Sequence, residues 1–144
     1  KTEAVKILRN VIFSNDPTYS TLSFFMILNE NLIDDKYEVS ELFDHLLENN
    51  KFDQEIRNLL LYKKALFKSN YVEESKLLEE TKSLLNSKES VWNAHVLLLL
   101  GDFYFSKKEF MKAKDFYTQI LFKKDLQPDL YNKAKSKLAL IADD

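Results

Sequence analysis

The chain has 144 residues and a formal net charge of −2, with 45% hydrophobic and 31% charged residues. This composition is typical of a globular domain and excludes a disordered chain, and the absence of cysteine excludes disulfides, thiolate metal sites and cysteine nucleophiles. The sequence has no block of basic residues of the kind that binds nucleic acid. Its longest apolar run is shorter than the roughly 18 residues that a membrane span needs.

Helical periodicity runs through nearly the whole chain and predicts eight helices joined by short polar turns. The single Gly and two Pro favour the same picture of long helices with short connections. Asp16 is the expected N-cap of the second helix, and Pro17 fits its first position. The predicted helices span about 2–13, 17–33, 38–48, 54–68, 72–85, 89–105, 109–123 and 128–142.

A long helix, a short turn and a second helix recur three times along the chain. An aromatic residue follows each turn, at Tyr37, Tyr71 and Phe110, with spacings of 34 and 39 residues. Periods of this size are typical of helical repeat proteins, in which stacked hairpins share one core. We therefore expect a single domain over 1–144, with a leading helix over 1–14, hairpins over 17–50, 53–86 and 89–124, and a capping helix over 127–142.

The best-preserved copy of the repeat lies in residues 97–121, and the two preceding copies match it loosely. Its large, small and aromatic side chains resemble the tetratricopeptide consensus, except at Ile120, where the consensus has Ala. The resemblance implies an all-α, right-handed superhelical stack of about three degenerate tetratricopeptide-like hairpins, with an extra helix at each end. The structural repeat positions are Gly101, Tyr104, Phe110, Ala113 and Tyr117.

Gly101 is the only glycine of the chain and lies inside a predicted helix. Glycine there costs about 1 kcal/mol relative to Ala, so its presence indicates a steric requirement. The consensus supplies one, because the two helices of a repeat touch at this position. We expect Ala113 to be the small residue that faces Gly101.

Several short motifs resemble a narrower family. They are LF-x-x-LL at 42–47, SVW at 90–92, LLGDF at 99–103 and KAKSKLALI at 133–141. Over about residues 15–142 the chain resembles the tetratricopeptide-like domain of YfgM-type bacterial envelope proteins. Members of that family have one N-terminal transmembrane helix, carry the repeat domain on the periplasmic side of the inner membrane, and associate with the secretion translocon and periplasmic chaperones.

This resemblance implies the periplasmic part of a membrane-anchored protein whose anchor is absent from the chain. The sequence begins at Lys1 without an initiator Met, which leaves an N-terminal anchor or export signal open. An apolar stretch of about 20 residues upstream would support the anchored interpretation.

The sequence predicts no catalytic, cofactor or metal site. His95 is followed by Leu98 and Leu99, and the carboxylates near His45 are common on solvated helices. The paired carboxylates lie at predicted turns or on polar faces, without the burial that a general acid needs. Phosphate-binding loops, nucleophile elbows and zinc-binding His-Glu-x-x-His motifs are absent.

The surface best suited to binding is the concave side of the stack, which the first helix of each hairpin lines. It is predicted to be largely apolar, and large apolar patches seldom face water without a partner. Either an extended or helical segment of another protein, or the chain's own first or last helix, is expected to fill it. The candidate peptide-groove residues are Leu22, Phe25, Asn29, Leu59, Lys63, Phe67, His95, Leu98, Asp102 and Phe105.

The leading hypothesis is a non-catalytic scaffold that binds other proteins or peptides, and that contacts neither nucleic acid nor membrane through this segment. One alternative is a self-association module, such as a homodimer, whose groove is filled by its own end helices. Another is a helical enzyme with an unrecognised site. Trp92 is expected to pack between neighbouring hairpins, and the alternative for it is an exposed binding anchor.

Overall fold

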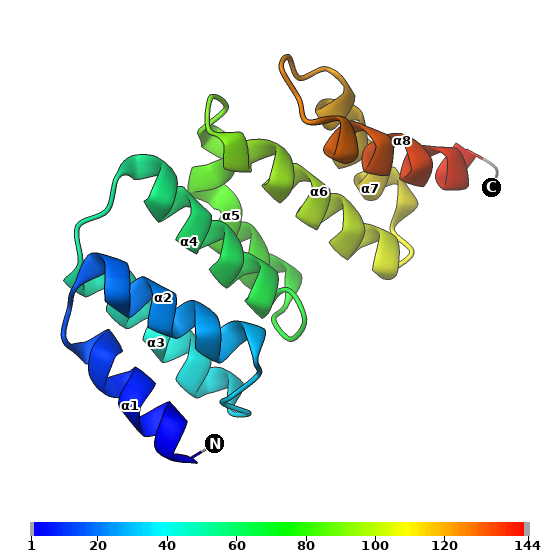
Figure 1. The fold of residues 1–144 in the computed structure, drawn as a ribbon. Coiled ribbons are helices and arrows are strands. Elements are labelled where there is room, and N and C mark those ends of the chain that lie inside the picture. Colours follow the sequence, from blue (N-terminus) through cyan, green and yellow to red (C-terminus); the bar gives the residue numbers. More distant parts are fainter. Residues whose placement is uncertain (1, 143–144) are drawn as a thin grey trace. The chain divides into compact units, whose positions relative to one another are not determined.

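The computed structural model describes residues 2–142, which form eight α-helices and no β-strand (Figure 1). Adjacent helices pack against each other in α1–α3 and again in α5–α8, and the predicted all-α class with eight helices is confirmed. Their bounds lie within two residues of those predicted, apart from the carboxyl end of α2. The helices are α1 (Thr2–Phe13), α2 (Pro17–Asn29), α3 (Lys36–Asn49), α4 (Gln54–Lys68), α5 (Glu74–Asn86), α6 (Val91–Ser106), α7 (Phe110–Leu121) and α8 (Pro128–Ala142).

The second helix, α2, ends four residues before the predicted end at Ile33. Asn31 has a positive φ of 50° and its N–H donates to the Leu28 carbonyl at 3.3 Å, while the Leu32 N–H donates to the Ile27 carbonyl at 3.0 Å. These two bonds form a Schellman motif, which closes a helix through one left-handed residue. Periodicity missed this end because Leu32 and Ile33 continue the apolar pattern beyond the point where Asn31 stops the helix.

Residues other than glycine take the left-handed positions in the turns. Positive φ angles occur at Asn15 (60°), Asn31 (50°), Lys108 (62°) and Asp125 (55°). Asn and Asp tolerate this region better than other side chains do. The turns of the described chain are therefore made without glycine, and Gly101 serves a different purpose.

Replacing Asp16 by Ala is expected to lower the free energy of unfolding by about 1 kcal/mol, because the substitution removes an N-cap. Asp16 Oδ1 accepts hydrogen bonds from the N–H groups of Thr18 and Tyr19, each at 3.0 Å, and Pro17 begins α2 as predicted. Urea unfolding followed by circular dichroism measures the loss. Asp16→Asn keeps the cap without the charge, so an equal loss in that control would contradict the capping explanation.

The chain forms two compact units, one ending at Leu60 and the other beginning at Leu61. The boundary lies inside α4, which contributes its first half to one unit and its second half to the other. The hairpin predicted over 53–86 therefore has residues in both units.

In the first unit, α1, α2 and α3 lie side by side (Figure 1). The rings of Phe24 and Phe43 meet edge to face, with centroids 4.5 Å apart. The buried hydroxyl of Ser20 donates to the carbonyl oxygens of Val11 and Ile12, each at 3.0 Å, and so ties α2 to the end of α1. The core of this unit consists of Val5, Ile12, Phe24, Ile27, Val39, Leu42, Phe43, Leu46, Leu47 and Leu60.

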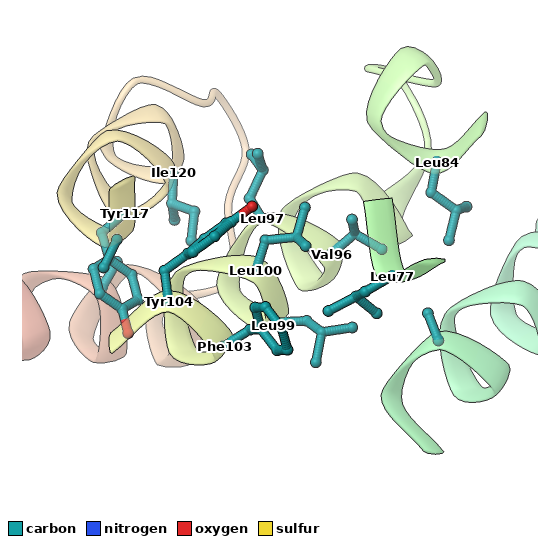
Figure 2. Close-up of a cluster of buried hydrophobic side chains, with 13 residues drawn as sticks. Leu77, Leu84, Val96, Leu97, Leu99, Leu100, Phe103, Tyr104, Tyr117 and Ile120 are labelled. Carbon is teal, nitrogen blue, oxygen red and sulfur yellow. The ribbon is translucent and has the colours of Figure 1, made fainter. Parts of the chain in front are cut away.

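In the second unit, α6 contacts α5, α7 and α8. Figure 2 shows Leu77 and Leu84 of α5, and Tyr117 and Ile120 of α7, in one cluster with the apolar side chains of α6. The buried Asn93 amide donates to the Leu84 carbonyl at 2.8 Å and so satisfies the end of α5. The buried cluster consists of Ala65, Leu77, Leu84, Val96, Leu97, Leu99, Leu100, Phe103, Tyr104, Ala113, Tyr117, Ile120 and Ala134.

Candidate functional site

Gly101 lies where α6 meets α7, as its position inside a helix predicted. A Cβ built on Gly101 would lie 2.5 Å from Cε1 and 2.7 Å from Cδ1 of Tyr117. The nearest side chain that requires glycine at position 101 is therefore the ring of Tyr117, a contact that the sequence analysis did not predict. Ala113 is fully buried in the same cluster, one helical turn away from Tyr117.

Tyr117 also fixes a polar group of α6. Its hydroxyl donates a hydrogen bond to Asp102 Oδ1 at 2.5 Å. Burial raises the pKa of the Tyr117 hydroxyl well above its usual value, and the bond to Asp102 raises it further. This hydrogen bond holds the Asp102 side chain on the side of α6 that faces α8.

The two remaining repeat positions form aromatic contacts on either side of this point. The ring of Tyr104 stacks on Phe116 with centroids 5.7 Å apart, and Phe110 meets Phe105 edge to face at 5.4 Å. Both pairs join α6 to α7. The repeat residues of the best-preserved copy are thus packing residues in the structure.

A cleft of about 570 Å³ lies beside α6 in the second unit. Leu98 and Asp102 line it from α6, and both are predicted groove residues. The helix α8 supplies the opposite side, with two lysines, an amide and a hydroxyl. The residues that line the α6–α8 cleft are Tyr62, Leu98, Asp102, Asn132, Lys133, Ser136 and Lys137.

Two more predicted groove residues lie at the edges of the α6–α8 cleft. The Lys137 ammonium lies 4.5 Å from the centroid of the Phe105 ring, a cation–π distance. At the other edge, His95 contacts Trp92 with ring centroids 4.7 Å apart, and Trp92 stacks on Tyr62 at 5.5 Å. Trp92 is therefore a packing residue against α4, in line with the interpretation that we favoured.

Two titratable groups beside the cleft, His95 and Tyr62, have pKa values shifted toward their neutral forms. Burial lowers the pKa of His95, the positive charge of Lys133 lowers it further, and Asp129 partly offsets this. Burial raises the pKa of the Tyr62 hydroxyl, and the negative charge of Asp102 adds to the increase. A neutral phenol and two ammonium groups make the cleft rich in hydrogen-bond donors, which suits a ligand rich in acceptors such as a peptide backbone.

The other predicted groove residues are distributed over both units. Leu22 and Asn29 are exposed on α2, and Phe25 beside them is half-buried. On α4, Leu59 belongs to the first unit, whereas Lys63 and Phe67 belong to the second; all three are half-buried. None of these six lines the α6–α8 cleft as the described residues form it.

Sequence reasoning missed the neighbour of Lys63 and all the α8 residues of the cleft. We predicted that Lys63 would line the groove, but the residue of α4 that lines the cleft is Tyr62, one position earlier. The repeat alignment of this loosely matched copy is therefore displaced by one residue. Lys133 and Lys137 are one helical turn apart on α8, and Ser136 lies beside them. The spacing of these residues was the only sequence feature that could have indicated them. It shows that they share one face of a helix, but it does not show which helix that face packs against.

Comparisons with known proteins identify no relative of this chain. No protein-family model, curated protein or solved structure matches the chain. Among residues 2–142, no group of three or more His, Asp or Glu is placed to hold a metal ion. No helix in the same range is both long and apolar enough to cross a bilayer.

Proposed function

We propose that this chain is a non-catalytic scaffold that binds a peptide segment of another protein in the α6–α8 cleft. The proposal rests on the composition of the cleft, in which the Tyr62 ring and the Leu98 side chain lie beside polar groups supplied by α8. Binding sites commonly combine an apolar surface with a few placed polar groups, within volumes of roughly 300–1,000 Å³. The cleft, at about 570 Å³, is sized for a few side chains and their backbone.

The chemistry of the cleft supports binding over catalysis. Asp102, a carboxylate that lines it, already accepts a hydrogen bond from Tyr117. The ammonium groups of Lys133 and Lys137 lie near Asp129 and Phe105, respectively. Among the described residues that line the cleft, no Ser hydroxyl is hydrogen-bonded to a base, as a nucleophilic mechanism requires.

The finer architecture and setting form part of the same proposal. The chain is a right-handed superhelical stack of tetratricopeptide-like hairpins, which the close approach of α6 and α7 at Gly101 supports. Its motifs resemble YfgM-type envelope proteins, so the proposed setting is the periplasmic side of the inner membrane. The proposed partners there are the secretion translocon or periplasmic chaperones.

The expected result is that a cleft-filling substitution abolishes peptide binding while a neighbouring one does not. Ser136 lines the α6–α8 cleft, whereas Lys135 is exposed on α8 outside it. Against a labelled library of apolar ten-residue peptides, Ser136→Trp should weaken binding of the selected peptides at least about tenfold, because one buried side chain is worth more than 1.4 kcal/mol. Fluorescence anisotropy measures the dissociation constants.

Lys135→Trp is the matched control and should change affinity less than about twofold, since exposed rim positions contribute little. Phe105→Ala should weaken binding as well, because Phe105 holds Lys137 at the edge of the cleft. Failure of every library peptide to bind saturably, or equal losses in the two Trp variants, would contradict the proposal.

A second candidate function is favoured by the position of α8. The last helix already lines the predicted groove, and its Lys137 contacts Phe105. This contact supports the alternative of a structural self-association module, whose groove is filled by the chain's own end helices. Sedimentation of the Ser136→Trp variant separates the two, because a dimer that this substitution dissociates would identify a second copy as the occupant.

A further inference from the structure

A second groove lies in the first unit, between α1 and α3, and has a different chemistry. Its volume is about 680 Å³. Phe13 and Leu42 form an apolar floor, and Phe13 exposes 52% of its surface although it is a large aromatic residue. We call it the acidic groove, and the residues that line it are Arg9, Phe13, Glu38, Glu41, Leu42, Asp44, His45 and Glu48.

Carboxylates line the α3 side of the acidic groove along its whole length. They occur at positions 38, 41, 44 and 48 of one helix, which spans roughly 15 Å at 1.5 Å per residue. Glu41 and Glu48 are exposed to solvent at two points of this row. Arg9 is the sole permanent cation among the described residues that line the groove, so its field is strongly negative.

The Arg9–Glu38 ion pair shows that a guanidinium fits into this surface. The Arg9 side chain reaches from α1 to Glu38 on α3 and forms a hydrogen bond with its carboxylate. A second hollow of about 360 Å³ lies on the other side of the pair, where Asp34 and Asp35 continue the negative surface. Arg9 thus occupies a position that an arginine of a ligand would also suit.

The opposite end of the acidic groove is closed by the His45 ring, which two side-chain amides hold in place. The His45 ring meets Phe13 edge to face, with centroids 4.5 Å apart. Its Nε2 lies 2.9 Å from Asn15 Oδ1 and its Nδ1 lies 3.2 Å from Asn49 Nδ2, so a ring protonated on Nε2 satisfies both amides. The His45 ring therefore extends the apolar floor as a flat wall.

We propose that the acidic groove binds a basic amphipathic helix of another protein. An apolar side chain of that helix lies on Phe13 and Leu42, and its Lys and Arg residues pair with Glu41, Glu48 and Glu38. Charges placed three and four residues apart match the spacing of side chains along one face of a helix. Helix-in-groove binding with complementary charge is a common mode of peptide recognition. The inference concerns the first unit and does not rest on the α6–α8 cleft.

The test uses the full chain and a designed, labelled 16-residue helical peptide. The peptide carries Leu at two positions four residues apart, with Lys and Arg on both flanks of that face. A scrambled peptide of the same composition lacks the periodicity. We expect the patterned peptide to bind at least about tenfold more tightly than the scrambled one at ~0.15 M salt, where non-specific attraction is screened. Equal affinities would overturn the proposal.

Charge reversal of the groove provides the matched pair of variants. The double substitution Glu41→Lys and Glu48→Lys should weaken binding of the patterned peptide at least about thirtyfold, since both carboxylates are exposed in the groove. Glu3→Lys with Glu30→Lys makes the same change in net charge at exposed positions outside it and should weaken binding less than about threefold. Similar losses in both pairs would show a general charge effect and overturn the proposal.

Arg9→Met distinguishes binding from a structural role of the ion pair. Removal of Arg9 frees Glu38 for the ligand, so the patterned peptide should bind about three- to tenfold more tightly. Unchanged or weaker binding by the folded variant would contradict the assigned guanidinium position. Sedimentation without peptide tests the rival occupant: a dimer that the Glu41→Lys/Glu48→Lys variant dissociates would place a second copy of this chain in the groove, and would overturn the proposal.

Discussion

Replacing Gly101 by Val is expected to lower the free energy of unfolding of the second unit by about 3 kcal/mol. A Cβ at position 101 would lie 2.5 Å from the Tyr117 ring, well inside van der Waals contact. The ring has little room to move, because Tyr117 is fully buried and its hydroxyl is bonded to Asp102 at 2.5 Å. Gly101→Ala should cost less, since Ala adds a smaller side chain and gains about 1 kcal/mol of helix propensity.

Trp92 fluorescence allows the unfolding of the second unit to be followed by itself. Trp92 is the only tryptophan of the chain and stacks on Tyr62 in the second unit. Urea unfolding followed by Trp92 fluorescence should therefore show a lower midpoint for Gly101→Val. In a Tyr117→Leu background the clash is relieved, so Gly101→Ala should become neutral or stabilising there. An equal cost of Gly101→Ala in both backgrounds would rule out the ring as the cause.

Replacing Glu80 by Ala is expected to lower the free energy of unfolding by about 2 kcal/mol, because it removes the carboxylate that pairs with two lysines of α4. Glu80 on α5 accepts a hydrogen bond from Lys68 Nζ at 2.8 Å, and Lys64 Nζ lies 3.4 Å from its other oxygen. The three side chains are only 12–14% exposed. Removal of one partner from a buried ion pair costs about 3–5 kcal/mol, and the residual exposure lowers that figure here.

Glu79 is the matched control for Glu80. Its side chain is 74% exposed and lies 3.9 Å from Lys76, a surface pair of the kind that contributes about 0–1 kcal/mol. Glu79→Ala should therefore leave the urea midpoint nearly unchanged. A loss as large as that of Glu80→Ala would mean that net charge, and not the buried pairing, stabilises α5.

The contribution of Glu80 should disappear in acid. Burial by itself raises the pKa of the Glu80 carboxyl, but the hydrogen bond from Lys68 and the charge of Lys64 outweigh it, so the pKa lies below its usual value. A pKa that is lower in the folded state gives stability above the unfolded-state pKa of about 4.3, and this stability is lost as the pH falls through the folded-state pKa. The difference in unfolding free energy between the parent and Glu80→Gln should therefore shrink below about pH 4. A difference independent of pH would contradict this assignment.

The two proposed binding surfaces can be tested separately, because they lie in different units and differ in charge. The α6–α8 cleft presents Lys133 and Lys137, whereas the acidic groove presents a row of carboxylates on α3. Ser136→Trp should leave binding of the basic helical peptide unchanged. Failure of one proposal is thereby distinguishable from failure of the other.

The sequence by itself determined the helices of this protein. Helix formation depends on hydrogen bonds between residues four apart and on apolar periodicity, both of which can be read locally. The N-cap at Asp16 and the close approach at Gly101 were also predictable, because each relies on a local rule. The end of α2 was not, since Asn31 stops the helix by adopting a conformation more usual for glycine.

Only the tertiary structure decided which helix faces meet. It placed the ring of Tyr117 against Gly101, and α8 beside Leu98 and Asp102. It also placed α1 against α3, which turned an ordinary row of solvated carboxylates into one side of a groove with Phe13 on its floor. Helical spacing specifies the residues on a face, but the pairing of faces depends on packing between residues far apart in the chain. The candidate sites are made by that pairing, so sequence reasoning found some of their residues without finding the sites.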